Sequence, residues 1–191
     1  NCAGGTAQHA YTLTVEDTTA PEFSEVPEDY TVECSAEMVM ADASASDNCS
    51  EVSIEVSSET IAGNATGNYT LVRTFTATDA CGNSSTATQT ITVEDTTAPV
   101  FTSVPEAYTV ECSDDMVLED ATAEDNCNGA EIQVSSQIVE GNATGNYTVI
   151  RTFTATDDAG NSNTATQTIT VEDTTAPVFT SVPVDYTTEC S

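Results

Sequence analysis

The chain repeats itself every 78 positions, and this period constrains its fold more than any other feature. The hexapeptide Glu-Asp-Thr-Thr-Ala-Pro begins at Glu16, at Glu94 and again at Glu172. When residues 16–93 are laid over residues 94–171 without a gap, 54 of 78 positions carry the same residue. A period of this size is typical of small modules joined in tandem, so each module has to bury its own core.

The repeat predicts four segments along the chain. Two complete modules span 16–93 and 94–171, residues 1–15 are interpreted as the C-terminal fragment of a preceding repeat, and residues 172–191 as the N-terminal fragment of a following one. The chain is therefore expected to be a window on a longer polymer of modules. A module of this size buries only about 60% of its unfolded surface, so a disulfide, a metal ion or a neighbouring module is expected to add stability.

The charge of the chain is strongly one-sided. It has 32 Asp and Glu residues against two basic ones, Arg73 and Arg151, and its formal net charge is −30. No nucleic acid partner is expected, because contacts to phosphate groups need Lys or Arg. Two explanations of the acidity stay open: a solvated surface suited to salty surroundings, and specific sites for divalent cations that relieve the self-repulsion.

Apolar and polar residues alternate along much of each module, which predicts β-strands. The clearest run spans 69–77, where every second residue falls on one face and threonines fill most of the other. Further strands are predicted at 22–26, 30–34, 52–56 and 87–93, with Gly- and Asn-rich turns at 63–68 and 81–84. A helical period is absent. The expected fold is all-β: tandem immunoglobulin-like antiparallel β-sandwich modules, each as long as one repeat.

Several short motifs occur in a fixed order within each module. They read DTTAP, TVEC, DNC, RTFTATDACGN and TATQTITVEDTTAP in the first complete copy. In this order and spacing the chain resembles, over its whole length, the hyalin-repeat (HYR) family of immunoglobulin-like domains. The closest version is found in long secreted surface proteins of Bacteroidota, including adhesins of gliding cells. The resemblance implies an extracellular, non-enzymatic array used for adhesion or as a structural stalk.

Four cysteines recur with the repeat. Cys34 and Cys49 are separated by 15 positions in the first module, and so are Cys112 and Cys127 in the second. We interpret each pair as a disulfide within its module, which would contribute about 3 kcal/mol by closing a loop of ~15 residues. Buried free thiols are one alternative, and a zinc site is another that the lack of CxxC spacing disfavours. Because a bridge needs Cα atoms within about 7 Å, the segment 35–48 should leave and return.

The other three cysteines have no repeated partner. Cys81 corresponds to Ala159 in the second module, so a bridge common to both modules cannot use it. We expect Cys81 to be a free thiol and Cys2 to be a similar remnant, with an intermolecular bridge as the alternative for Cys81. Cys190 corresponds to Cys34, and its expected partner would lie beyond residue 191.

Acidic residues of the linkers are expected to meet those of one turn in each module. In an immunoglobulin-like sandwich the last strand ends at the pole facing the next module, so the turn before it lies beside the incoming linker. Carboxylates gathered there would repel one another unless a cation lay among them, and calcium accepts six to eight oxygen ligands. The alternatives are solvated acidic loops and Asp side chains that only cap turns. The predicted ligands are Glu16, Asp17, Asp47 and Asp79, and in the second module Glu94, Asp95, Asp125 and Asp157.

The sequence Asp-Thr-Thr in each linker resembles the O-glycosylation signal of Bacteroidota surface proteins. This resemblance marks Thr18, Thr96 and Thr174 as glycosylation sites. The alternative is that Asp-Thr-Thr only begins a turn before the proline.

The two arginines occupy the same position of their modules. Arg73 and Arg151 are each expected to form an internal ion pair and to stack on Phe75 or Phe153. Ligand binding by these arginines is the alternative.

Catalysis is not expected, because neither complete module contains His or Lys and no paired acids lie in an evident apolar cleft. The expected function is a structural or adhesive segment of a long bacterial cell-surface fibre, with neighbouring repeats of the same chain as partners. Two alternatives stay open: a self-assembling extracellular filament that joins copies of the chain, and a carbohydrate-binding accessory module with a glycan ligand. No apolar run approaches ~20 residues, so this segment is not expected to insert into a membrane.

Overall fold

The chain divides into two compact units, Asn1–Asp95 and Thr96–Ser191. The structure is a computed structural model that describes residues 8–190, so Cys2 lies outside the described residues. Each strand of the second unit lies 78 residues after its counterpart in the first. Among residues 8–190 there is no helix long and apolar enough to cross a membrane.

Within the described residues 8–190, each unit contains six strands. The first has β1 (Glu22–Glu25), β2 (Tyr30–Glu33), β3 (Ser44–Ser46), β4 (Ser53–Ala62), β5 (Tyr69–Thr78) and β6 (Ser84–Glu94). The second has β7 (Val100–Ser103), β8 (Tyr108–Glu111), β9 (Thr122–Glu124), β10 (Glu131–Glu140), β11 (Tyr147–Thr156) and β12 (Ser162–Glu172). Every strand predicted from the sequence is present. The pattern does not predict β3, because three residues are too few to show alternation.

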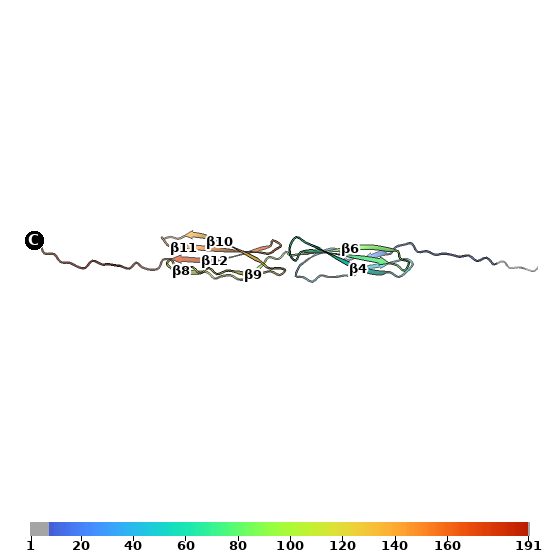
Figure 1. The fold of residues 1–191 in the computed structure, drawn as a ribbon, viewed down its shortest axis with the longest axis horizontal. Coiled ribbons are helices and arrows are strands. Elements are labelled where there is room, and N and C mark those ends of the chain that lie inside the picture. Colours follow the sequence, from blue (N-terminus) through green and yellow to red (C-terminus); the bar gives the residue numbers. More distant parts are fainter. Residues whose placement is uncertain (1–7, 191) are drawn as a thin grey trace, which may run out of the picture. The chain divides into compact units, whose positions relative to one another are not determined.

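The strands of each unit form two sheets. In the first unit a four-stranded sheet has the order β2-β6-β5-β4 and a two-stranded sheet pairs β1 with β3. The second unit has the same arrangement, and Figure 1 shows its long strands β10, β11 and β12 side by side. The predicted all-β sandwich is confirmed. One pair in each unit departs from its antiparallel pattern: β2 runs parallel to β6, and β8 parallel to β12, because the chain changes sheet after β1 without reversing direction.

The core of each unit lies on one face of its longest strands. Phe75 and Ala77 on β5 and Ile91 on β6 are fully buried in the first unit, and the equivalent residues are fully buried in the second. Residues between them, mostly threonines, are half-buried on the other face of β5. This two-residue period is the one that the sequence predicts for 69–77.

The two ends of the first unit bring different residues together. We call one end the entry pole, where the side chain of Asn83 donates a hydrogen bond to the carbonyl of Asp17 at 3.1 Å. At the other end, the exit pole, the N–H of Cys34 donates to the carbonyl of Glu94 at 3.1 Å. Because β6 has 11 residues, the poles lie about 33 Å apart. The entry pole comprises Asp17, Asp47, Cys49 and the turn 79–83, and the exit pole comprises Glu33, Cys34, the turn 63–68, Glu94 and Asp95.

Candidate metal centre

The turn between β5 and β6 fixes the position of Asp79. Its Oδ1 accepts hydrogen bonds from the N–H groups of Cys81 (2.9 Å) and Asn83 (2.8 Å), and its Oδ2 accepts one from the Asn83 side chain (2.8 Å). Gly82 allows the turn to close, because its φ of 91° lies in the left-handed region that favours glycine. Asp79 is only 7% exposed. The turn therefore holds a buried carboxylate at the entry pole.

Two more carboxylates reach the entry pole from separate loops. Asp47 follows β3, and its Oδ2 accepts the N–H groups of Cys49 (2.8 Å) and Ser50 (3.2 Å). Asp17 lies in the incoming linker, and its Oδ1 accepts the N–H of Thr19 (3.0 Å). Each loop thus uses one carboxylate oxygen to stabilise its own turn. The second oxygen of each Asp remains for another partner.

The three carboxylates converge. Asp17, Asp47 and Asp79 each place an oxygen within 4.8 Å of the other two. The Oδ2 of Asp17 and the Oδ1 of Asp47 are buried and accept no hydrogen bond from the residues that the structure describes. Burial without a partner is costly for a carboxylate oxygen, and negative charges at this distance repel one another. A bound cation would remove both costs.

The corresponding residues of the second repeat form the same kind of group. Within the second unit, Asp125 and Asp157, the counterparts of Asp47 and Asp79, also place oxygens within 4.8 Å of each other. The Oδ2 of Asp125 accepts the N–H of Cys127 at 2.9 Å, and its Oδ1 is buried with no hydrogen bond from any described residue. The Oδ1 of Asp157 accepts the N–H of Gly160 at 2.7 Å. The arrangement is therefore a property of the repeat.

The structure corrects one part of the predicted ligand sets. Glu16 and Glu94 are exposed and belong to none of the acidic groups among residues 8–190. Successive side chains of an extended segment point to opposite sides, and Asp17 and Asp95 already face the poles. Each predicted set of four is thus reduced to three.

The pKa values of two side chains at the entry pole are shifted, for different reasons. Burial raises the pKa of Asp79, but hydrogen bonds from Asn83, Cys81 and Gly82 outweigh it, so this pKa lies below its ordinary value of 3.8. The pKa of the Cys49 thiol is raised, first by the negative charge of Asp17 and then by burial and further acidic neighbours. Asp79 therefore stays ionised at neutral pH, next to a thiol that stays protonated.

The cysteines are not paired as predicted. Cys49 and Cys112 are free, whereas Cys34 and Cys127 are disulfide-bonded. The predicted bridges within each module are therefore wrong. Cys81, expected to be a free thiol, is free.

The physical reason lies in the direction of the chain. Cys34 hydrogen-bonds to Glu94 at the exit pole, while Cys49 lies at the entry pole, where the charge of Asp17 acts on it. About 33 Å separates the poles, and a disulfide tolerates at most about 7 Å between Cα atoms. The segment between the two cysteines carries the chain from one pole to the other instead of closing a loop.

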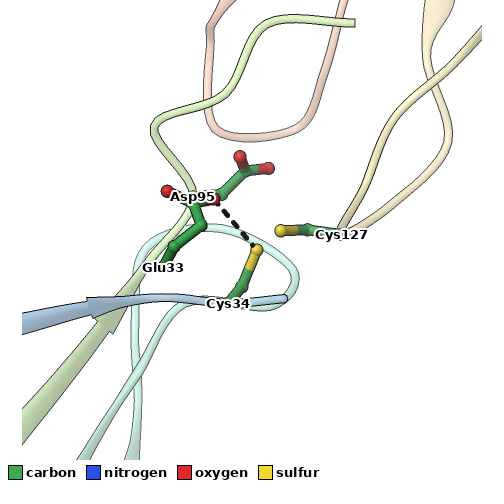
Figure 2. Close-up of side chains that lie close together, drawn as sticks. All are labelled: Glu33, Cys34, Asp95 and Cys127. Atoms are coloured by element: carbon green, nitrogen blue, oxygen red, sulfur yellow. Dashed lines mark hydrogen bonds between the residues drawn. The ribbon is translucent and has the colours of Figure 1, made fainter. Parts of the chain in front are cut away.

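The exit pole holds a second group that the sequence analysis does not predict. The Sγ of Cys34 and carboxylate oxygens of Glu33 and Asp95 lie within 4.8 Å of one another, and Figure 2 shows the side chain of Cys34 directed toward Asp95. Because Cys34 is disulfide-bonded, its sulfur is not the thiolate that a metal ion binds. The Sγ of Cys34 lies 3.3 Å from the Oε1 of Glu33. The N–H of Asp95 donates to the Oδ1 of Asn68 at 2.8 Å. The signal that could reveal this pole is the pair Glu-Cys, which recurs at 33–34, 111–112 and 189–190.

In the second unit the equivalent group is Glu111, Cys112 and Asp173, and a predicted glycosylation site, Thr174, lies beside it. The hydroxyl of Thr174 donates to the Oε2 of Glu111 at 2.5 Å, and this bond is the main cause that lowers the pKa of Glu111. A glycan on Thr174 would replace the donated hydrogen. Thr18 and Thr96 are exposed, and O-glycosylation of all three threonines stays a prediction.

The buried arginine of the first unit is held by neutral groups. Its Nη1 donates to the carbonyl of Ala41 (2.7 Å) and to the Oε1 of Gln89 (2.9 Å). The guanidinium carbon lies 4.9 Å from the ring centroid of Phe75. The predicted stacking of Arg73 is confirmed, but an internal ion pair is not, since both donated bonds end on neutral oxygens.

Arg151 makes the same contacts in the second unit, with one addition. Its Nη1 donates to Glu119 and Gln167, and its guanidinium lies over Phe153. Its Nη2 also lies 3.7 Å from the Oδ1 of Asp120, a side chain that is 88% exposed. An ion pair with so exposed a partner contributes little.

Residues 23–93 and 100–171 each match the family described as "HYR-like domain with 4 cysteines". The chain belongs to this family. The matched regions contain three and two cysteines, fewer than the four of that description. No curated protein matches the sequence.

Several solved structures have a similar fold. Drosophila N-cadherin EC1-4 is 16% identical with a TM-score of 0.38, and the match covers 81% of this chain and 50% of that one. Human protocadherin-24 EC1-2 is 15% identical with a TM-score of 0.36, covering 83% of this chain and 100% of that one. The Ig1-2 module of the Drosophila receptor protein tyrosine phosphatase DLAR is 13% identical with a TM-score of 0.29, covering 81% and 100%. The chain spans about half the length of the first cadherin structures it matches.

Proposed function

We propose that this chain is a structural or adhesive segment of a long extracellular fibre at a bacterial cell surface, and that calcium stiffens each of its junctions. The segment contributes reach and rigidity and no catalysis. Its membership of an HYR-like repeat family and its two equivalent units support a repeating fibre. The observation that carries the calcium part is the pair of buried, unpaired carboxylate oxygens of Asp17 and Asp47 beside Asp79.

Calcium fits the entry pole by its chemistry. The three Asp side chains offer oxygen ligands, and calcium binds oxygen in flexible geometry, with carbonyls or waters completing the shell. Magnesium demands a near-octahedral arrangement at shorter distances. Calcium, when bound, supplies positive charge between the three carboxylates.

The origin of the three ligands explains the mechanical effect. Asp17 comes from the incoming linker, Asp47 from the loop after β3, and Asp79 from the turn before β6. An ion held by all three would fix the linker to the body of its repeat. It would thereby restrict the hinge between successive repeats.

The binding experiment uses the 191-residue protein after removal of divalent ions. Calcium titration by calorimetry is expected to saturate with a Kd of about 10⁻⁴–10⁻³ M, the range of extracellular modules. Asp47→Asn is expected to weaken binding at the first site, whereas Glu55→Gln, on the exposed strand β4, serves as the matched control. Absence of calcium binding, or equal weakening by both variants, would contradict the calcium proposal.

The proposed stiffening by calcium has its own test. Small-angle scattering of the protein with calcium and with chelator is expected to show a narrower distribution of inter-repeat orientations with calcium. An unchanged scattering profile would remove the stiffening role and leave the repeats as a flexible chain.

A second function, self-association into a filament, is favoured by one observation. Strand β10 lies at the edge of its sheet and exposes Val134 (45%), Ile138 (62%) and Val139 (43%). A long apolar edge strand is a template for pairing with another chain. Sedimentation at increasing concentration is expected to show association that Ile138→Lys abolishes and the control Gln137→Lys retains. A protein that stays monomeric throughout would exclude the filament.

A further inference from the structure

We infer that Cys49 and Cys81 form a disulfide with each other when the protein is oxidised, and that this bond closes the entry pole of the first unit. Both cysteines lie within Asn1–Asp95. Both thiols are free and exposed in the structure. Formation of the bond does not depend on calcium, whereas its effect on calcium binding rests on the proposed function.

Two loops bring these cysteines to the same place. Cys49 lies in the loop between β3 and β4, and Cys81 lies in the turn between β5 and β6. The N–H of Ala80 donates to the Oγ of Ser50 at 3.2 Å. A hydrogen bond of this kind keeps the Cα atoms of its two residues within roughly 7 Å of each other. Because Cys49 directly precedes Ser50 and Cys81 directly follows Ala80, the loops are joined right beside both cysteines.

The two cysteines are also anchored in the same way. The N–H of Cys49 donates to the Oδ2 of Asp47 at 2.8 Å, and that of Cys81 donates to the Oδ1 of Asp79 at 2.9 Å. Asp47 and Asp79 in turn place oxygens within 4.8 Å of each other. Contacts that bring the carboxylates together thus bring the backbones of both cysteines together as well.

The electrostatic surroundings of Cys49 agree with this placement. The charge of Asp17 is the main cause that raises the pKa of the Cys49 thiol, and burial is the next. The charges of Asp47 and Cys81 raise it further, so the two sulfurs lie within electrostatic range of each other. A disulfide needs Cα atoms within about 7 Å, which is the separation that the hydrogen bond between the loops permits. Small adjustments of two exposed loops therefore suffice for the bond.

The second unit cannot form this bond. Ala159 stands where the first unit has Cys81. The turn is nevertheless built in the same way, because the Oδ1 of Asp157 accepts the N–H of Asn161 at 2.9 Å. The turn thus needs no cysteine to form, and replacing Cys81 by Ala removes a thiol without removing the turn.

Formation of the bond consumes a small disulfide such as oxidised glutathione. One cysteine loses its proton, and its thiolate attacks the glutathione disulfide, which forms a mixed disulfide and releases one glutathione. The thiolate of the second cysteine then displaces the other glutathione. The protein gives up two electrons and two protons, and the glutathione disulfide is reduced to two thiols. Disulfides form and persist in extracellular and periplasmic compartments, where the proposed fibre would be assembled.

The bond would join two of the proposed calcium ligands. Asp47 and Asp79 lie two positions before the bonded cysteines, so their separation would be fixed before an ion arrives. Such preorganisation lowers the entropic cost of binding. Oxidation is therefore expected to tighten calcium binding at the first site, and calcium is expected to favour the oxidised pair by the same factor. The bond also closes a loop of 32 residues (81 − 49), which restricts the unfolded chain.

Peptide mapping tests the bond directly. The 191-residue protein is oxidised with glutathione disulfide in chelator at low protein concentration, its remaining thiols are alkylated under denaturing conditions, and it is digested with a protease that cleaves after Glu. Cys49 then lies in peptide 38–51 and Cys81 in peptide 60–94. We expect these two peptides to stay joined until reduction. Alkylation of both cysteines, or a link from either of them to a different cysteine, would overturn the inference.

Two variants separate the bond from its consequences. Cys81→Ala should abolish the joined peptides, whereas Cys112→Ser, which removes a free and exposed thiol of the second unit, should retain them. Oxidation should slow hydrogen exchange in the core of the first repeat about 100-fold in the control and not in Cys81→Ala. Equal exchange in both oxidised variants would contradict the stabilising role.

Calorimetry then tests the effect on the calcium site. Oxidation should lower the Kd of the first site several-fold in the control and leave it unchanged in Cys81→Ala. An unchanged Kd in the control, with the joined peptides present, would refute the coupling between bond and site. Absence of calcium binding in every sample would refute the proposed calcium function, but the joined peptides, mapped in chelator, would still be expected.

Discussion

Each repeat buries charged side chains in two places, at its centre and at its entry pole. The hydrogen bonding of the charged groups differs between the two. At the centre of the first unit, Arg73 donates to Ala41 and Gln89 and stacks on Phe75, so the charge is provided for by the chain itself. At the entry pole, Asp17 and Asp47 bury carboxylate oxygens that accept no hydrogen bond from any described residue. The comparison teaches that the body of the repeat should be stable in any buffer, while its end should respond to what the solution contains.

The largest expected effect comes from the centre. Arg73→Ala would leave the carbonyl of Ala41 and the amide oxygen of Gln89 buried without a donor, at about 1–3 kcal/mol for each such group. It would also remove the contact with Phe75. We expect the first repeat to lose about 3 kcal/mol of unfolding free energy, with or without calcium, measured by urea denaturation and repeat-resolved hydrogen exchange.

The second unit supplies the controls for this prediction. Arg151→Ala should cost the second repeat a similar amount, because its donors reach equivalent groups. Asp120→Asn should cost less than about 0.5 kcal/mol, since the exposed ion pair contributes little. A large effect of Asp120→Asn would mean that the buried arginine depends on its ion pair after all.

The next largest effect belongs to the entry pole, and its sign should depend on calcium. In chelator, Asp47→Asn removes one of three neighbouring negative charges, so the variant should be at least as stable as the parent protein. With calcium at ten times its Kd, the parent should gain about 1.4 kcal/mol that the variant lacks. Thermal melts of both proteins in the two buffers would show the curves crossing. If the two proteins had the same order of stability in both buffers, the claim that the entry pole responds to calcium while the centre does not would be contradicted.

A smaller effect should come from the turn that presents Asp79. Gly82 has a φ of 91°, and a Cβ added there would meet no atom within 4 Å, so Gly82→Ala tests backbone strain alone. We expect a loss of about 1 kcal/mol, the low end of the cost of a left-handed conformation for a residue with a Cβ, measured by urea unfolding. Gly129→Ala, where the space is also open and no positive φ occurs, is the matched control. Equal costs for both variants would show that the turn is not held in the left-handed region.

The sequence predicts the centre of each repeat better than its ends. Alternation over 69–77 is a local signal, and it correctly predicts the buried face and the stacking of Arg73 on Phe75. The composition, with 32 acidic residues, also suggests an acidic partner for the arginine, and this expectation is not confirmed for Arg73. Composition does not reveal that Gln89, on the neighbouring strand β6, supplies a neutral acceptor.

The residues that meet at the ends of each repeat are harder to predict from the sequence, because the prediction has to assign each loop to one of the two poles. Asp17 and Asp79 could be placed together from the topology of a sandwich, since the last turn and the incoming linker share a pole. The predicted pairing of Cys34 with Cys49 is wrong because the sequence does not show which pole each cysteine reaches. A spacing of 15 residues fits a closed loop and a segment that crosses the whole module equally well. Only the position of Cys34 beside Glu94 distinguishes these cases.

The last and most confined prediction concerns acid pH. Hydrogen bonds from Asn83, Cys81 and Gly82 lower the pKa of Asp79 beneath 3.8 in the folded protein. A group whose pKa is lower in the folded state contributes stability above its unfolded value, and this contribution is lost as the pH falls through the folded value. In chelator, the stability difference between the parent protein and Asp79→Asn should therefore be constant near neutral pH and shrink below about pH 4. Asn83→Ala removes donors to the carboxylate, so it should move this loss to higher pH. If the difference persisted unchanged into acid, the turn would be held by its backbone alone and the charge of Asp79 would serve only to attract a cation.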